Sequence, residues 1–212
     1  EKLAQMTSDD AADSLKIVPF RGDYYALRPE KRHLVRGMIY PVPDPEFPFL
    51  GVHFTRLING DVWAGPNAVL AFAREGYKRW DIHLGELAET LTYPGFLRLA
   101  RKYWKTGLTE MYRDYVKGAY VAQLKRYMPE IEPGDLVPGP SGVRAQALER
   151  SGLLVDDFKI QHGSRVAHVR NAPSPAATSS LVIARMIVDD VLQRTDLNLA
   201  RSYSPNMAAV GW

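Results

Sequence analysis

The sequence has no cysteine among its 212 residues, which excludes disulfide bonds, thiolate metal sites and a cysteine nucleophile. This composition fits a reducing compartment without requiring one. No apolar run approaches the roughly 20 residues that a membrane-spanning helix needs, so we expect no such helix in these residues.

Several motifs that mark common active sites are also missing. The sequence contains no Gly-x-Gly-x-x-Gly, no P-loop and no Gly-x-Ser-x-Gly. The five histidines show no metal-ligand spacing, so we expect no metal site.

Positive charge is modest overall but concentrated in one stretch. The net charge of +3 and a pI of about 9.1 are too mild to indicate nucleic acid, and we expect no nucleic-acid partner. Residues 95–128, however, hold eight Lys or Arg against two acids. Four of the basic residues, Arg98, Arg101, Lys102 and Lys105, lie largely opposite an apolar stripe. This pattern is typical of a solvent-facing amphipathic helix, and a second interpretation is docking on an anionic membrane surface.

The first half of the chain shows strand patterns followed by helix patterns. Residues 16–28, 33–40, 49–57 and 62–65 are predicted as strands, the last two joined by a hairpin at Asn59-Gly60. Apolar residues recur with helical spacing over residues 96–104 and 109–127, with a break expected at Gly118.

The second half returns to strands and ends in a helix. Prolines and glycines over residues 129–140 predict a loop, and strands are expected at 143–148, 153–161 and 165–170. A helix from Ser174, as N-cap, to Arg194 follows, with Pro175 in its first turn. The sum is an α+β fold with a mostly antiparallel or mixed sheet and helices.

The junction between the last strand and the last helix is rich in small residues. A helix N-terminus presents unpaired N–H groups and partial positive charge, and small side chains let a flat ligand approach the backbone. Residues 168–180 therefore suit a phosphate, a carboxylate or the N1/C2=O edge of a flavin. The alternative is a well-capped helix packed on a sheet.

Six short runs together make this chain resemble the L-2-hydroxyglutarate dehydrogenase/oxidase family, within the FAD-dependent oxidoreductases related to D-amino-acid oxidase. Besides the junction just described, they are Val18-Pro19-Phe20-Arg21-Gly22-Asp23-Tyr24, Pro41-Val42-Pro43-Asp44, Gly51-Val52-His53-Phe54-Thr55, Gly65-Pro66-Asn67-Ala68 and Gly142-Val143-Arg144-Ala145-Gln146. The resemblance implies oxidation of L-2-hydroxyglutarate, a hydroxy diacid, to 2-oxoglutarate, with hydride passing to FAD. It also implies membrane-associated members and a possible quinone contact.

Members of that family begin with a Rossmann-type FAD-binding part, which this sequence lacks. The resemblance therefore implies a fragment made of a lead-in (1–14), a substrate-binding domain (15–163), the closing strand and helix of the FAD domain (164–195) and a tail (196–212). We expect these residues alone to bind no FAD and to be inactive, because the missing N-terminal part would grip the dinucleotide.

Two histidines compete for the role of base. His53 lies on a strand whose Leu50, Val52 and Phe54 point one way, so His53 and Thr55 point the other way. His168 ends the strand before the last helix, where it would be the base or would orient flavin and substrate. Imidazole titrates near working pH, which suits proton transfer from a hydroxyl. The alternative for each is a histidine that is hydrogen-bonded within the fold.

Two arginines are candidates for holding the carboxylates of the substrate. Arg144 and Gln146 share one face of a strand, and a guanidinium can hold a carboxylate with two hydrogen bonds. A surface ion pair is the alternative for Arg144. Arg21, next to Gly22, would meet either the flavin or the distal carboxylate.

The resemblance assigns cofactor contacts to the last junction, namely Asn171, Ala172, Pro173, Ser174 and Ala176. Two other functions remain open: a related flavin oxidase of an amino or N-methyl acid, and a non-catalytic binding domain. The expected location is cytoplasmic or peripheral membrane for a bacterial protein and mitochondrial for a eukaryotic one.

Overall fold

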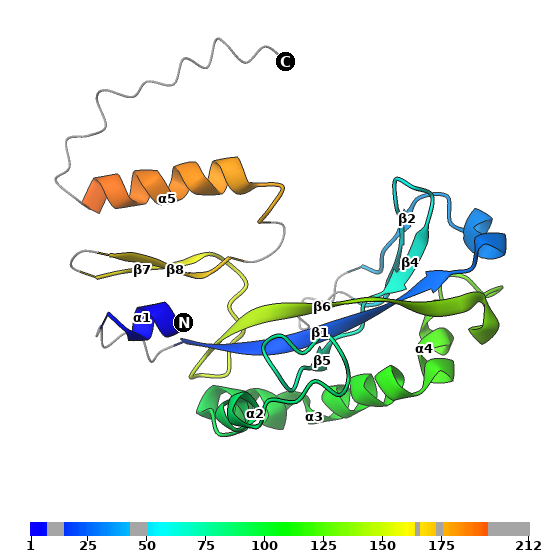
Figure 1. Cartoon of the computed structure of the whole chain (residues 1–212), viewed down its shortest axis with the longest axis horizontal. Coiled ribbons are helices and arrows are strands. Elements are labelled where there is room, and N and C mark those ends of the chain that lie inside the picture. The colour runs from blue at the N-terminus through cyan, green and yellow to red at the C-terminus, as the bar shows by residue number, and fades with distance from the viewer. Residues whose placement is uncertain (8–14, 43–50, 164–165, 173–175, 195–212) are drawn as a thin grey trace, which may run out of the picture. The chain divides into compact units, whose positions relative to one another are not determined.

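The computed structural model describes residues 1–7, 15–42, 51–163, 166–172 and 176–194 (Figure 1). The chain divides into two compact units, Glu1–Asp156 and Asp157–Trp212. This division lies a few residues before the boundary at 163/164 that we expected, because strand β7 pairs with β8 in the second unit.

A six-stranded antiparallel sheet forms the first unit. Its strands are β1 (Leu15–Leu27), β2 (Met38–Ile39), β3 (His53–Arg56), β4 (Val62–Gly65), β5 (Val69–Leu70) and β6 (Leu136–Glu149). The order is β2-β3-β4-β1-β5, with β6 paired along nearly the whole of β1. The hairpin predicted at Asn59-Gly60 is confirmed, since it joins the antiparallel pair β3 and β4.

Helices cover one side of the long β1–β6 ribbon in Figure 1. The helices of this unit are α1 (Lys2–Gln5), α2 (Leu84–Leu91), α3 (Pro94–Tyr115) and α4 (Lys117–Leu124), with 3-10 turns at Pro29–Leu34 and Pro133–Asp135. Of these helices, α1 is a short segment at the N-terminus and α2 to α4 form the cover. The α+β class and the largely antiparallel sheet predicted from sequence are confirmed.

Two apolar clusters fix the helices to the sheet. Even-numbered Val18 and Phe20 of β1 pack with residues of α3, including Leu99. Odd-numbered residues of the same strand, Tyr25 and Leu27, pack with α4. The β1–β6 register is irregular between Asp23 and Tyr25, and such irregularities increase local twist. Because of this irregularity, even-numbered residues of β1 face α3 and odd-numbered residues face α4.

The second unit contains a β-hairpin and one helix. β7 (Lys159–His162) pairs with β8 (Ala167–Asn171), and α5 runs over Ser180–Arg194. His162 Nε2 lies 2.6 Å from Asp190 of α5, which links the hairpin to the helix.

Several predicted boundaries were wrong. Residues 33–40 hold the end of a 3-10 turn and the short β2 instead of one strand, because Pro29 favours a tight turn. The helix break lies at Val116, two residues before Gly118. The predicted loop over 129–140 yields to β6 from Leu136, where Pro138 and Pro140 are tolerated because β6 pairs on one side only. The start proposed at Ser174 lies outside the described residues, but Ala176 to Ser179 form a turn and the described helix begins at Ser180.

Candidate functional site

One side of β3, β4 and the end of β1 collects aromatic side chains around a histidine. Phe54, Val62 and Ala64 are buried against α4, so the side chains that alternate with them point to the opposite side. We call this surface the aromatic face, and its members are Tyr24, Tyr40, His53, Thr55 and Trp63.

Contacts among these side chains hold the aromatic face together. The rings of Tyr24 and Trp63 lie 5.5 Å apart in a tilted arrangement. The Tyr40 ring stacks on the imidazole of His53, and the Tyr40 hydroxyl lies 3.4 Å from Thr55 Oγ1. Burial raises the pKa of the Tyr24 phenol, and the neighbouring Tyr40 phenol adds to this effect. The Tyr24 phenol is thus present as a neutral hydrogen-bonding group at neutral pH.

His53 is half-buried on this face, and its environment keeps it neutral. Burial lowers the pKa of His53, although the Gly51 carbonyl works in the opposite direction. Nδ1 lies 3.3 Å from that carbonyl oxygen, which can only accept a hydrogen bond. When Nδ1 donates to it, Nε2 holds the lone pair and is the atom able to accept a proton.

His168, the competing base, lies in the second unit. It sits on β8 opposite Gln161 of β7 and is half-buried. The structure therefore places the two candidate histidines in separate compact units.

The predicted carboxylate-binding residues differ in what their side chains do. Gln146 is buried, and its Nε2 donates to the backbone carbonyls of Ala147 and Val155 at 3.2 and 3.0 Å. Arg144 is exposed and lies opposite Phe20 in the β1–β6 register. Of this pair, Arg144 is the side chain that solvent reaches.

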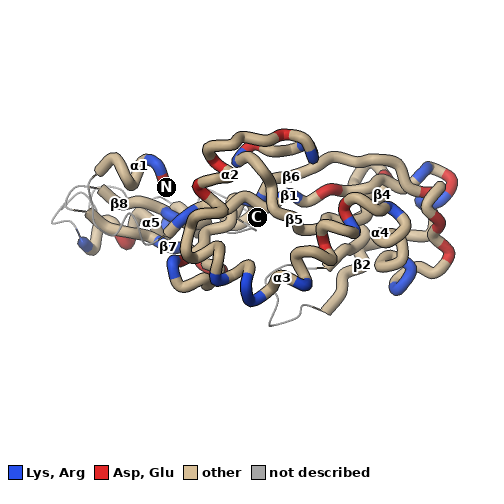
Figure 2. Tube along the Cα trace, turned by 90° about the horizontal axis from the view of Figure 1, so that it is seen from below, with Lys and Arg blue, Asp and Glu red and all other residues tan. Residues whose placement is uncertain are grey.

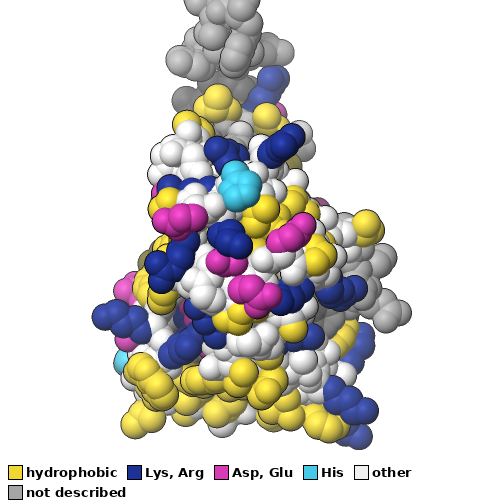
Figure 3. Space-filling view, turned by 90° about the vertical axis from the view of Figure 1, so that its right-hand side faces the viewer, with side chains coloured by type: hydrophobic (Ala, Val, Ile, Leu, Met, Phe, Trp, Pro, Cys, Tyr) yellow, Lys and Arg dark blue, Asp and Glu magenta, His cyan; other side chains and the backbone are white. Residues whose placement is uncertain are grey.

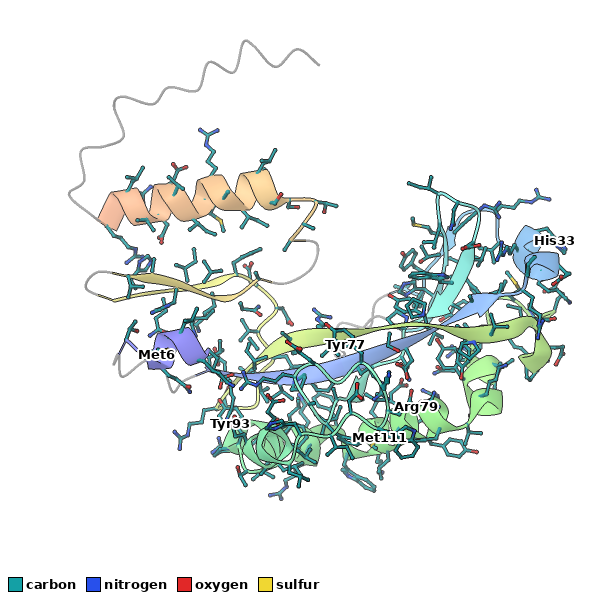
Figure 4. All side chains as sticks on the ribbon, viewed as in Figure 1. Met6, His33, Tyr77, Arg79, Tyr93 and Met111 are labelled. Atoms are coloured by element: carbon teal, nitrogen blue, oxygen red, sulfur yellow. The ribbon has the colours of Figure 1, made fainter. Side chains whose placement is uncertain are left out.

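Arg21 lies in a buried ion cluster that the sequence did not predict. Its side chain is 3% exposed, and Nη2 donates to Asp114 at 2.8 Å while Nε donates to Asp23 at 3.1 Å. Nη1 donates to the Lys78 carbonyl at 3.3 Å. Arg79 adds a second guanidinium 3.2 Å from Asp114, and Figure 4 shows it between the long strands and α3. Because each nitrogen of Arg21 already has a partner in the protein, we do not assign it to a substrate carboxylate.

The ion cluster fixes the turn beside His53. Asn67 donates to Asp114 at 2.7 Å and accepts from the Asp23 N–H at 2.7 Å. Gly65, two residues before Asn67, is the register partner of His53. Gly65 has φ +135°, and a Cβ there would lie 2.6 Å from the Tyr120 hydroxyl, so only glycine fits. The run Gly65-Pro66-Asn67 is thus tied to α3 on one side and to the histidine strand on the other.

A sequence signal for Asp114 existed but is weak. Asp114 is one of two acids in the basic stretch, and it lies on the extension of the apolar stripe through Tyr103 and Gly107. A charged residue on an apolar helix face indicates a buried partner. Nothing in the spacing identifies that partner as Arg21, which is 93 residues away.

The predicted cofactor segment is described in part. Asn171 is buried and donates to the Asp157 carbonyl at 2.8 Å, Ala172 is exposed, and Ala176 lies in the turn before α5. Pro173 and Ser174 lie outside the described residues. A buried donor of this unit, Gln161 Nε2, has no hydrogen-bond partner among the described residues. Gln161 is the neighbour of His162, which contacts Asp190 ten residues after the described start of α5, so this donor is not placed at the helix start.

The described residues meet the requirements of neither a metal site nor a membrane-spanning helix. Within the described residues, no group of three or more His, Asp or Glu is placed to hold a metal ion. None of the described helices combines the length and the apolar character needed to cross a bilayer.

Comparison with known proteins assigns the chain to a family. The model of the family described as "FAD dependent oxidoreductase" (DAO) matches residues 2–190. The chain belongs to this family. The resemblance inferred from the six sequence runs is therefore confirmed at the family level.

Its relatives within the DAO family share one name. The chain is 54% identical over 194 residues to "L-2-hydroxyglutarate dehydrogenase" of Indibacter alkaliphilus, which covers 92% of the chain and 48% of that protein. It is 60% and 53% identical over 187 residues to "L-2-hydroxyglutarate dehydrogenase, mitochondrial" of Nematostella vectensis and Homo sapiens, covering 86% of the chain and 41% and 40% of those proteins. The chain thus spans less than half the length of the curated relatives it matches.

Proposed function

We propose that this chain is the substrate-facing part of an FAD-dependent enzyme that oxidises L-2-hydroxyglutarate to 2-oxoglutarate. The similarity to three proteins of that name supports the substrate, and the family supports the cofactor. The structural observation that carries the proposal is a half-buried histidine with a lowered pKa on the aromatic face.

The oxidation removes a hydride from C2 of the hydroxy acid and a proton from its hydroxyl. When bound, FAD supplies the two-electron acceptor for the hydride. His53 takes the proton at Nε2, while the Gly51 carbonyl holds Nδ1–H and fixes the tautomer. Tyr40 covers one face of the imidazole, which excludes water from that side and fixes the ring plane.

In this proposal Arg144 is assigned to one carboxylate of the substrate by the resemblance to related flavin oxidases. The structure does not bring Arg144 together with His53, because its register partner Phe20 packs toward α3 whereas His53 points away from α4. A planar guanidinium offers two parallel N–H donors to a carboxylate, and the exposed position of Arg144 lets a solute reach it. Gln146 supports the strand through its two backbone contacts instead of contacting the substrate.

The second unit contributes the residues that would hold the flavin. Asn171 fixes the β8 end through the Asp157 carbonyl, and Ala172 and Ala176 have small side chains. The dinucleotide half requires a Gly-rich turn that this sequence lacks, so binding of FAD depends on the remaining part of the full-length protein.

A related oxidase of an amino or N-methyl acid is the second candidate function. An amine can lose hydride without a strong base, whereas a hydroxy acid benefits from one. The neutral imidazole of His53 on the aromatic face is such a base, and it favours the hydroxy acid.

Anaerobic flavin reduction in the full-length protein separates the two candidates. We expect L-2-hydroxyglutarate to bleach the flavin absorbance, and its D enantiomer, L-glutamate and N-methyl-L-glutamate to leave it unchanged. Bleaching by either amino acid with none by L-2-hydroxyglutarate would refute the proposed substrate.

Peripheral docking on an anionic membrane is part of the proposal. Arg98, Arg101, Lys102 and Lys105 are all exposed on α3, and Figure 2 shows Lys and Arg recurring along this helix. Leu97, Trp104 and Leu108 of the same helix are more than half exposed. Basic residues beside exposed apolar ones are typical of helices that lie on an anionic bilayer, where a quinone acceptor would be available. The eukaryotic relatives named above are mitochondrial by name.

A further inference from the structure

Helix α3 is kinked half-way along its length, and its two halves contact the sheet differently. The backbone at Tyr103 is non-helical, with φ −117° and ψ 21°, so the helix is kinked there. Before the kink, Leu99 packs with Val18 of the sheet and is buried. After the kink, Trp104 and Leu108 continue the same apolar stripe but are 56% and 59% exposed.

An apolar pocket of about 350 Å³ lies between α3 and the sheet, spanned by the kink. The sheet side includes Phe20 and Leu70, and the helix side includes Phe96, Tyr103, Gly107 and Met111 (Met111 is labelled on α3 in Figure 4). Its charged lining residue, Glu110, is paired with Arg113 at 2.6 Å. The pocket is the size of a small-ligand site, and its walls offer mainly hydrocarbon and aromatic surface.

Two ammonium groups lie on the aromatic rings of this pocket. Lys102 Nζ is 4.9 Å from the centroid of Tyr103, and Lys105 Nζ is 5.6 Å from the centroid of Trp104. Both rings line the pocket. A ligand that fits must therefore be apolar over most of its length and negatively charged at one end.

Apolar surface continues outside the pocket. Tyr112 and Tyr115 of α3 are exposed, as are Trp80 and Ile82 of the preceding segment, and the rings of Trp80 and Tyr115 lie 6.3 Å apart. In Figure 3 hydrophobic side chains gather along the lower edge of the face, the level at which α3 and α4 run in Figure 1. A water-soluble ligand needs only the pocket, whereas a lipid in a bilayer also needs such a surrounding surface.

We infer that the pocket beneath α3 binds one acyl chain of an anionic phospholipid, with Lys102 and Lys105 at its headgroup. The inference rests on the proposed membrane docking and is independent of the proposed reaction. Membrane docking and lipid binding in the pocket can fail separately. Basic residues alone would hold the protein on a bilayer by charge, whereas an occupied pocket makes binding depend on the space inside the pocket.

Two matched glycines provide the test. A Cβ at Gly107, which lines the pocket, would meet nothing within 4 Å, and the same holds for Gly118 of α4, which is not among the lining residues. Leucine has a higher helix propensity than glycine, so neither substitution is expected to destabilise its helix. Gly107→Leu fills the pocket, while Gly118→Leu adds an equal apolar side chain elsewhere.

The experiment measures flotation of the full-length protein with phosphatidylglycerol vesicles. We expect about a tenfold weaker partition for Gly107→Leu, equivalent to losing two buried methylene groups, and wild-type partition for Gly118→Leu. We also expect dibrominated phosphatidylglycerol chains to quench a tryptophan signal in wild type that is missing in Trp104→Phe, with less quenching in Gly107→Leu.

Three outcomes would overturn the inference. Equal partition of both leucine variants would show that charge alone holds the protein. Equal binding to phosphatidylcholine would remove the headgroup role of the lysines. Salt-sensitive flotation without quenching of Trp104 would leave the docking proposal standing and show that the pocket is closed to lipid, as it would be if another part of the full-length protein covered it.

Discussion

The ring of Tyr40 stacks on the imidazole of His53, with centroids 4.3 Å apart and an interplanar angle of 25°. The stack joins β3 to the segment that follows β2, and it covers one face of the histidine. Coverage of this kind removes water from an ionisable group, which is the main cause of the lowered pKa of His53. The proton-accepting form of the imidazole is therefore favoured by a neighbouring side chain.

The pH dependence of the reaction should report this stack. His53 must be neutral to accept a proton, so kcat/KM of the full-length enzyme should fall as pH decreases through the pKa of His53, below the ordinary value of about 6.5. In Tyr40→Ala water reaches the imidazole of His53, so the pKa of His53 rises towards that value. The fall in kcat/KM should then move to higher pH. Tyr112→Ala, a change at an exposed tyrosine of α3, should leave the profile unchanged. An identical acidic limb in wild type and Tyr40→Ala would disconnect the stack from the titrating group.

Arg144→Lys should weaken the use of L-2-hydroxyglutarate. An ammonium cannot form the paired hydrogen bonds of a guanidinium, and losing one charge-assisted contact costs about 1.5–3 kcal/mol in transition-state binding. Steady-state kcat/KM should therefore fall by roughly tenfold to a hundredfold. Arg36→Lys, at another exposed arginine, serves as control. Unchanged kinetics in a folded Arg144→Lys protein would remove this residue from the substrate site.

Asp114→Asn should destabilise the fold. The change removes a buried charge that pairs with Arg21 and Arg79. Removing one partner of a buried ion pair costs up to about 3–5 kcal/mol in the free energy of unfolding, and Asp23, which still contacts Arg21 at 3.1 Å, reduces that cost. Asp189→Asn, which breaks an exposed pair with Arg185 on α5, should cost about 0–1 kcal/mol. Urea denaturation measures both.

A double-mutant cycle isolates the pair itself. If Arg21 and Asp114 act together, Arg21→Met with Asp114→Leu should be less destabilising than the sum of the single changes. Strict additivity would mean that the 2.8 Å contact contributes no coupling to stability.

Membrane docking should depend on the charges of α3. Binding to phosphatidylglycerol vesicles should weaken with added salt, because the Debye length is about 8 Å at physiological ionic strength and 3 Å at 1 M. Lys102→Gln/Lys105→Gln should bind less than Arg36→Gln/Arg185→Gln, which removes the same charge from exposed positions elsewhere. Salt-independent flotation, or equal loss in both variants, would count against docking through α3.

Local patterns in the sequence predicted the elements that local forces decide. The strand at Leu15–Leu27, the hairpin at Asn59-Gly60 and the apolar stripe of α3 follow from side-chain periodicity and turn chemistry. The alternation around His53 was predicted for the same reason, because Val52 and Phe54 are buried while His53 and Thr55 are half-exposed.

Features that depend on distant partners were not predicted. The strand from Leu136 runs through two prolines because β1 supplies its hydrogen bonds, and nothing local indicates that. Arg21 was interpreted as a ligand-binding arginine, but its partner Asp114 comes from α3, far along the chain. Tyr24, Tyr40 and Trp63 were not recognised as neighbours of His53, since three separate segments bring them together. The short strand β5 and helix α2 carry patterns too short to identify.

The most direct test of the central claim is the rate of anaerobic flavin reduction by L-2-hydroxyglutarate in full-length wild type, His53→Gln and His168→Gln. If His53 is the base, His53→Gln should slow the reductive step by about 10²- to 10⁴-fold with little change in the substrate dissociation constant. His168→Gln should retain a rate much closer to that of wild type. A wild-type rate in His53→Gln, with the loss found in His168→Gln instead, would contradict the account and move the proton acceptor from the aromatic face to β8.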